Sequence, residues 1–123
     1  MSYHEPEDKL TPEAIDYHRI IKSVIEELEA VDWYNQRAVA TDDPDVEAIV
    51  AHNRDEEIEH ACMGLEWLRR NSEVWDEMLR TFLFKDAKIT EIEEDEMAEG
   101  EKEANPASNS KGSLGLGSMR GGE

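Results

Sequence analysis

Apolar side chains recur every three or four residues along the first part of the chain, which is the pattern of an amphipathic helix. The first stripe comprises Tyr17, Ile20, Ile21, Val24, Leu28 and Val31. Thr11 and Pro12 precede it, and they are typical of a helix start, with threonine at the N-cap and proline at the first helical position. The pattern predicts a helix from Pro12 to about Val39, preceded by a loose arm over residues 1–10.

A second apolar stripe begins after a break at residues 41–44. Asp43 is placed to cap a new helix and Pro44 to begin it, and the helix should end near Asn71. Its stripe comprises Val46, Ile49, Val50, Asn53, Glu57, Ala61, Gly64 and Leu68. Because the connection is short, we expect an antiparallel hairpin of two helices. Each helix would be about 40 Å long at roughly 1.5 Å per residue.

A third, shorter helix is expected after Ser72, which would be its N-cap residue, and it should end around Phe84. Its apolar positions are Val74, Trp75, Met78, Leu79 and Phe82. The fold class is therefore all-α, with a helical domain over residues 11–84. This domain is small for a stable core of its own, so self-association is expected.

The composition changes after residue 84. Residues 85–113 are acidic and then polar, which predicts a disordered linker, although the acidic part could also form a frayed helix. Residues 114–123 place Leu114, Leu116 and Met119 in a Gly/Ser background. That pattern suits an extended peptide that docks on another protein, and the alternative is an inert tail.

The chain is strongly acidic, with 31 acidic and 13 basic residues and a net charge of −18. Such a surface repels nucleic acid and anionic membranes, so neither is expected as a partner. It attracts cations, although simple solubility is an equally common reason for acidic composition. Cys62 is the single cysteine, which excludes an intrachain disulfide and fits a reducing compartment. With no signal peptide or apolar run of membrane-span length, we expect a soluble cytoplasmic protein.

Glu57-x-x-His60 is the first candidate for chemistry, because side chains three apart on a helix share a face. Glu57 lies in the middle of the stripe that should be buried. An unpaired carboxylate there costs several kcal/mol, so it needs a cation or a proton. For this spacing alone, a buried ion pair with an arginine or a satisfied core histidine is the commoner explanation.

Glu27 strengthens the metal interpretation. It borders the apolar stripe of the first helix, 12 residues before Val39, whereas Glu57 lies 13 residues after Pro44. In an antiparallel hairpin these two positions are nearly level. No arginine or lysine shares the two stripes, so two carboxylates and the imidazole of His60 at one height favour a metal ion.

One chain holds only half of a familiar ligand set. Ferritin-like di-iron bundles use one glutamate from each of two helices and Glu-x-x-His from each of the other two. Two facing copies of this hairpin would complete both the ligands and a four-helix bundle. The hypothesis is a metal site on a dimer interface, formed by Glu27, Glu57 and His60 of each copy.

A second acidic group lies on the back of the first helix. Glu26 and Glu29 share that face with Trp33, and Tyr34 is nearby. A solvated acidic face is the commoner case. An exposed tryptophan favours a contact surface or an access path for cations that leads to the buried site.

Several stretches together closely resemble the encapsulated ferritins. They are SVIEELEAVDWY at residues 23–34, AHNRDEE at 51–57, EHA at 59–61 and EWLRRN at 66–71. The resemblance spans roughly residues 11–84. In addition, LGLGSMR at residues 114–120 resembles the targeting peptide that docks cargo inside encapsulin shells, with Met119 where leucine is more usual.

The resemblance implies a ferroxidase. Glu27, Glu57 and His60 would be its iron ligands, with two irons per dimer interface and Glu57 bridging them. Glu26 and Glu29 would form an outer metal-attracting site near Trp33. The ligands alone would also accept zinc, manganese or cobalt, so the choice of iron rests on the resemblance.

The resemblance also implies partners. It predicts a homodecamer, a ring of five dimers, that oxidises Fe(II) with dioxygen and supplies iron for storage inside an encapsulin nanocompartment in the cytoplasm. Residues 114–120 would bind the shell protein. The competing interpretation is a non-catalytic helical cargo or adaptor protein, whose acidic residues serve solubility or loose cation binding.

Overall fold

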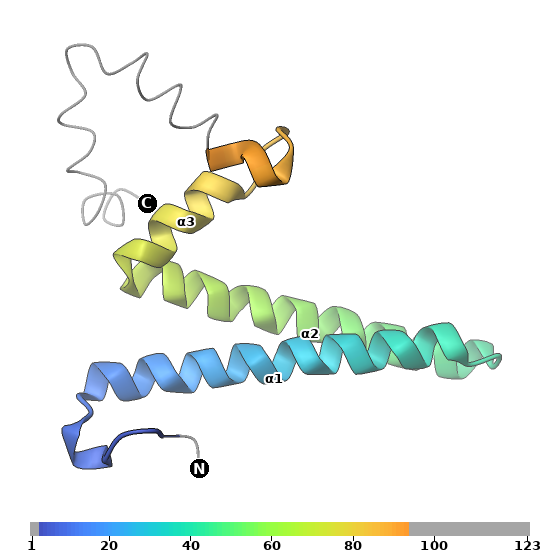
Figure 1. Cartoon of the computed structure of the whole chain (residues 1–123). Helices are drawn as coiled ribbons and strands as arrows, with labels where there is room; N and C mark the ends of the chain where they lie inside the picture. The colour runs from blue at the N-terminus through green and yellow to red at the C-terminus, as the bar shows by residue number, and fades with distance from the viewer. Residues whose placement is uncertain (1–2, 94–123) are drawn as a thin grey trace. The chain divides into compact units, whose positions relative to one another are not determined.

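The computed structural model describes residues 3–93 of the 123-residue chain. In that part the regular elements are all helical, which confirms the predicted all-α class (Figure 1). They are the 3-10 helices η1 (Glu7–Lys9) and η2 (Ile89–Glu91) and the α-helices α1 (Pro12–Ala40), α2 (Pro44–Asn71) and α3 (Glu73–Phe82). The chain divides into two compact units, Met1–Trp67 and Leu68–Glu123.

The predicted start of each long helix is confirmed by a side-chain cap. Thr11 Oγ1 accepts a hydrogen bond of 3.0 Å from the backbone N–H of Ala14. Asp43 Oδ1 accepts from the backbone N–H groups of Asp45 and Val46, at 2.8 and 3.2 Å. Each cap satisfies N–H groups that have no partner within the helix. These local contacts explain why α1 and α2 begin where the sequence indicates.

The third helix also begins as predicted but ends earlier. Ser72 Oγ accepts from the backbone N–H of Trp75 at 3.3 Å and so caps α3. The helix ends at Phe82, with Leu83 as its extended C-cap. Phe84, the predicted end, has φ 61°. Its left-handed backbone is incompatible with a continuing right-handed helix.

The segments flanking the helices contain short ordered turns. The N-terminal residues include η1, and the ring of Tyr3 lies edge-on to the ring of His18, with centroids 4.9 Å apart. Residues 85–93 contain η2, and Ile92 is buried. The rest of the predicted linker and the predicted targeting peptide at residues 114–123 lie outside the described residues.

Within the first unit, α1 and α2 lie side by side and antiparallel, as predicted (Figure 1). Val24 and Ala38 of α1 and Ala61 of α2 are buried. Gly64 permits a close approach of the two helices, because a Cβ atom at this position would lie 2.5 Å from Val24 Cγ2. Small residues on α2 therefore set how closely it packs against α1.

Some of the predicted core is not covered in the single chain. Leu28 and Val46 belong to the predicted stripes but are 56% and 42% exposed. An apolar stripe on a helix spans 100° or more, and one neighbouring helix covers only part of it. Further large apolar side chains of the hairpin are exposed at Tyr17, Ile25, Ile49, Ile58 and Met63. The hairpin alone therefore leaves an extensive apolar surface in contact with solvent.

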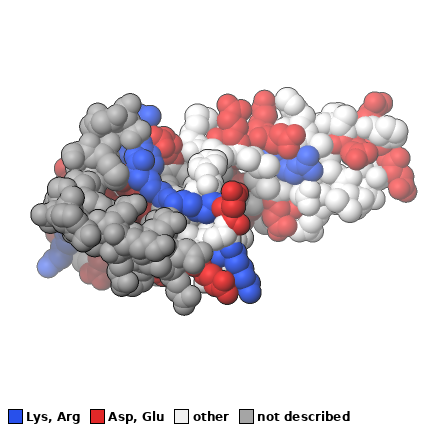
Figure 2. All heavy atoms as spheres, turned by 90° about the horizontal axis from the view of Figure 1, so that it is seen from above, with Lys and Arg blue, Asp and Glu red and all other residues white. Residues whose placement is uncertain are grey.

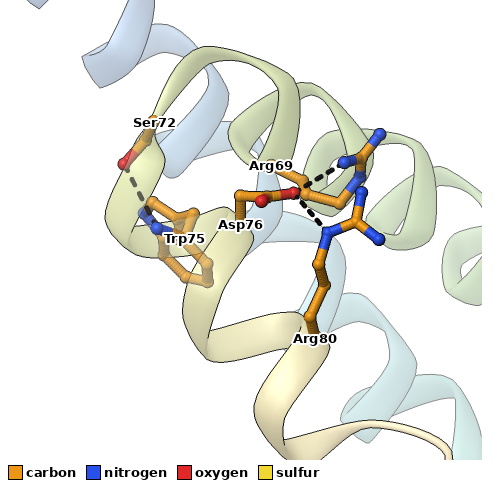
Figure 3. A network of polar contacts seen from close by, with 5 residues as sticks. All are labelled: Arg69, Ser72, Trp75, Asp76 and Arg80. Carbon is orange, nitrogen blue, oxygen red and sulfur yellow. Dashed lines mark hydrogen bonds and ion pairs between the residues drawn. The ribbon is translucent and has the colours of Figure 1, made fainter. Parts of the chain in front are cut away.

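A buried ion cluster organises the second unit (Figure 3). Asp76 in the first turn of α3 is only 1% exposed. Its Oδ1 accepts hydrogen bonds from Arg69 Nη1 at 2.6 Å and from Arg80 Nε at 3.0 Å. Two guanidinium groups thus compensate one buried carboxylate, and they join the end of α2 to α3.

No described helix is long and apolar enough to cross a lipid bilayer.

Candidate metal centre

The second helix brings Glu57 and His60 together, as their spacing predicts. His60 Nδ1 lies 3.6 Å from Glu57 Oε1, one helical turn away. The two side chains are 44% and 27% exposed, respectively. Glu57 is therefore half-buried in the single chain, and His60 is accessible. Because neither side chain is fully buried, each could contact a different partner, such as a metal ion, while the backbone of α2 remains helical.

Glu27 of α1 carries an unsatisfied oxygen. The residue is half-buried, and its Oε1 is buried without any hydrogen-bond partner. Val24 and Val31 lie on the same side of α1, three residues before and four after Glu27. A carboxylate oxygen that has lost water and gained no donor is costly to keep ionised. This atom is accordingly suited to receive a cation.

An arginine near this site binds elsewhere. Arg54 lies three residues before Glu57, at the edge of the predicted stripe, where the sequence analysis counted no basic residue. Its Nη1 donates to Asn35 Oδ1 of α1 at 3.0 Å, and its Nε donates to Asp55 Oδ1 at 3.1 Å. The alternative of a buried Glu57–arginine ion pair is therefore wrong for the described part of the chain.

One chain does not assemble a complete site. Among residues 3–93, no three histidine, cysteine, aspartate or glutamate side chains lie together in a way that could hold a metal ion. Glu27 forms no ion pair with His60 in the same range. The structure thus brings Glu57 and His60 together and leaves Glu27 with an open carboxylate on the neighbouring helix.

The outer acidic group of α1 is exposed. Glu26 and Glu29 are both on the surface, and the side chain of Trp33 is 52% exposed. Tyr34 is half-buried, and the guanidinium carbon of Arg37 lies 5.1 Å from the centre of its ring. Figure 2 shows acidic side chains spread along the visible face of the hairpin, with few basic ones between them. This surface attracts cations.

A further histidine–carboxylate pair lies on the outer face of α2. His52 Nε2 is 3.2 Å from Glu56 Oε2, and both side chains are more than half exposed. Their i, i+4 spacing is the signal that identifies the pair in the sequence. The contact was not among the candidates named from the sequence, because it lies away from the apolar stripe on which those candidates were sought.

Comparison with known proteins finds similar sequences over most of this chain. The EncFtn-like family model matches residues 2–86. An encapsulated ferritin-like protein of Rhodospirillum rubrum is 52% identical over 124 residues, covering 98% of this chain and 89% of the relative. A ferritin-like protein of Thermotoga maritima is 59% identical over 93 residues, covering 76% and 82%.

A solved structure is also similar. The crystal structure of a protein from Nitrosomonas europaea superimposes with a TM-score of 0.70 at 52% identity. The match covers 72% of this chain and 98% of the other. The helical arrangement described above is therefore shared with a relative of known structure.

Proposed function

Because the chain belongs to the encapsulated ferritin-like family, we propose that it oxidises Fe(II) to Fe(III) with dioxygen at a site shared by two copies of the chain. The observation that carries the proposal is the half-buried Glu27, whose Oε1 has no partner. Glu57 supports it, because the nearby guanidinium group of Arg54 is bound elsewhere. Both carboxylates are available to a cation.

The donor atoms fit iron. Glu27, Glu57 and His60 would hold the metal, since carboxylate and imidazole suit Fe(II) and carboxylates favour the harder Fe(III) product. Each Fe(II) ion loses one electron, and dioxygen accepts it. The residues contribute negative charge where positive charge increases. Glu57 also lies beside His60, which keeps the imidazole on the face where the ligands gather.

A second copy of the chain would complete the site. One hairpin supplies one glutamate helix and one Glu-x-x-His helix, which is half of the set found in ferritin-like di-iron bundles. The exposed Leu28 and Val46 are apolar surface that another hairpin would cover. We therefore propose two irons at each dimer interface and a four-helix bundle of two chains. The resemblance to the encapsulated ferritins alone supports the proposed further assembly into a ring of five dimers.

We also propose a shell partner and an outer iron-attracting site, both of which rest on the family to which the chain belongs. The relative from Rhodospirillum rubrum carries the description encapsulated, so we propose that residues 114–120 bind an encapsulin shell and that the oxidised iron is stored there. We further propose that Glu26 and Glu29 attract Fe(II) at the exposed acidic face near Trp33. Neither exposed glutamate forms a hydrogen bond or ion pair in the described part of the chain, so both are open to cations.

The proposal is tested by adding Fe(II) to the full-length protein in air and following the ultraviolet absorbance of Fe(III). We expect the wild-type protein to accelerate oxidation and Glu27→Ala to remove most of that acceleration, because the variant lacks the open carboxylate. Glu13→Ala, at the exposed start of α1, is the control for loss of one negative charge. Equal rates for wild type and Glu27→Ala would favour the adaptor alternative instead.

A further inference from the structure

Arg54 is the cationic side chain nearest in sequence to Glu57, and it is a potential competitor for iron. Residues three apart on a helix have Cβ atoms about 5–6 Å apart, so the long arginine side chain can reach Glu57. A guanidinium–carboxylate pair is among the stronger side-chain contacts, with up to two parallel hydrogen bonds. If Arg54 paired with Glu57, an incoming cation would have to displace it.

The structure shows Arg54 in a different pairing. The side chain is 28% exposed, and its Nη1 donates to Asn35 Oδ1 on the facing helix at 3.0 Å. Its Nε donates to Asp55 Oδ1 at 3.1 Å. Asp55 supplies a compensating negative charge, and the amide of Asn35 fixes the direction of the guanidinium group across the hairpin.

Asn35 is suited to this role because its side chain is neutral. Its oxygen accepts from Arg54 without adding another carboxylate that could bind metal on this face of the hairpin. Glu57 consequently has His60 as its nearby polar partner in the described residues. We infer that Asn35 is a positioning residue that holds Arg54 away from Glu57 and thereby keeps this carboxylate free for a divalent cation. The inference rests on the proposed function, because it assumes that Glu57 binds metal.

The test is a calorimetric titration with Co(II), accompanied by its visible absorption, at one fixed protein concentration. Co(II) accepts the same ligands and reports binding without turnover. In Asn35→Ala, the released guanidinium can pair with Glu57, and we expect about 5-fold weaker binding, the equivalent of roughly 1 kcal/mol for a partly exposed ion pair. Asn35→Asp retains the acceptor, so its affinity should equal or exceed that of wild type.

A second substitution separates competition from a purely structural effect. If Arg54 is the competitor, adding Arg54→Gln to the Asn35→Ala variant should restore wild-type Co(II) affinity. A double variant as weak as Asn35→Ala would overturn the inference. Gln36→Ala is the matched control, because Gln36 is the adjacent exposed amide and donates to Asp32 at 3.2 Å on its own helix. It should bind Co(II) as wild type does.

The failures of the two proposals are distinguishable. If the wild-type protein does not bind Co(II) and Glu57→Ala changes nothing, the proposed site itself is wrong. If wild type binds through Glu57 but Asn35→Ala binds equally well, the proposed site stands and the role of Asn35 is refuted. Thermal unfolding of each variant, compared with wild type, checks that the hairpin remains folded.

Discussion

Glu57→Ala is expected to lower the rate of aerobic Fe(II) oxidation by about 100-fold or more. Even the loss of a group that only orients a metal ligand typically costs about 10–100-fold in affinity or activity, and Glu57 is proposed as a ligand itself. The effect should exceed that of other single substitutions, because Glu57 is the proposed ligand that would be shared by the two irons of a dimer interface. Stopped-flow absorbance of Fe(III) formation measures it.

Glu59→Ala is the matched control for this prediction. Glu59 is exposed on the same helical turn, and the substitution removes the same charge and the same side-chain length. It should reduce the oxidation rate less than two-fold, through the weaker attraction of cations alone. If Glu57→Ala and Glu59→Ala lowered the rate equally, general surface charge rather than a defined site would account for the activity.

Asp76→Ala is expected to lower the free energy of unfolding by about 3 kcal/mol, because removing one partner of a buried ion cluster leaves uncompensated charge. The carboxylate is 1% exposed, and its loss leaves the guanidinium groups of Arg69 and Arg80 without their shared acceptor. Arg80 is 41% exposed and can regain water, whereas Arg69 is only 11% exposed. Most of the loss should therefore arise at Arg69.

Urea unfolding of the metal-free protein, at one protein concentration, measures this effect. Glu77→Ala is the control, since Glu77 is the next residue of α3, is exposed and loses the same negative charge on replacement by alanine. It should change stability by less than about 0.5 kcal/mol. Similar losses for both variants would show that the buried cluster does not stabilise the second unit.

The parts of the fold that were predictable depend on neighbours in the sequence. Thr11, Asp43 and Ser72 each cap a helix through backbone N–H groups two or three residues away, so their residue types alone indicate the helix starts. The spacing of Glu57 and His60 likewise fixes their common face. Contacts of this range are set by helix geometry and need no knowledge of packing.

The parts that could not be predicted depend on residues distant in sequence or on surface coverage. The bond between Arg54 and Asn35 joins positions 19 residues apart, and no local pattern selects that partner for the arginine. Leu28 belongs to an apolar stripe, but its 56% exposure depends on how much of α1 a single neighbouring helix covers. Asp76 is not one of the apolar positions of the third helix, so the sequence pattern gives no sign that this acidic side chain is buried.

The most direct test of the shared site is native mass spectrometry of the protein titrated with Fe(II) under anaerobic conditions. The chain has a mass of 14.1 kDa. The account predicts that iron is bound only to particles that contain an even number of chains, at one iron per chain, and that Glu57→Ala particles of any mass lack it. Iron bound stoichiometrically to a single chain of 14.1 kDa would contradict the account.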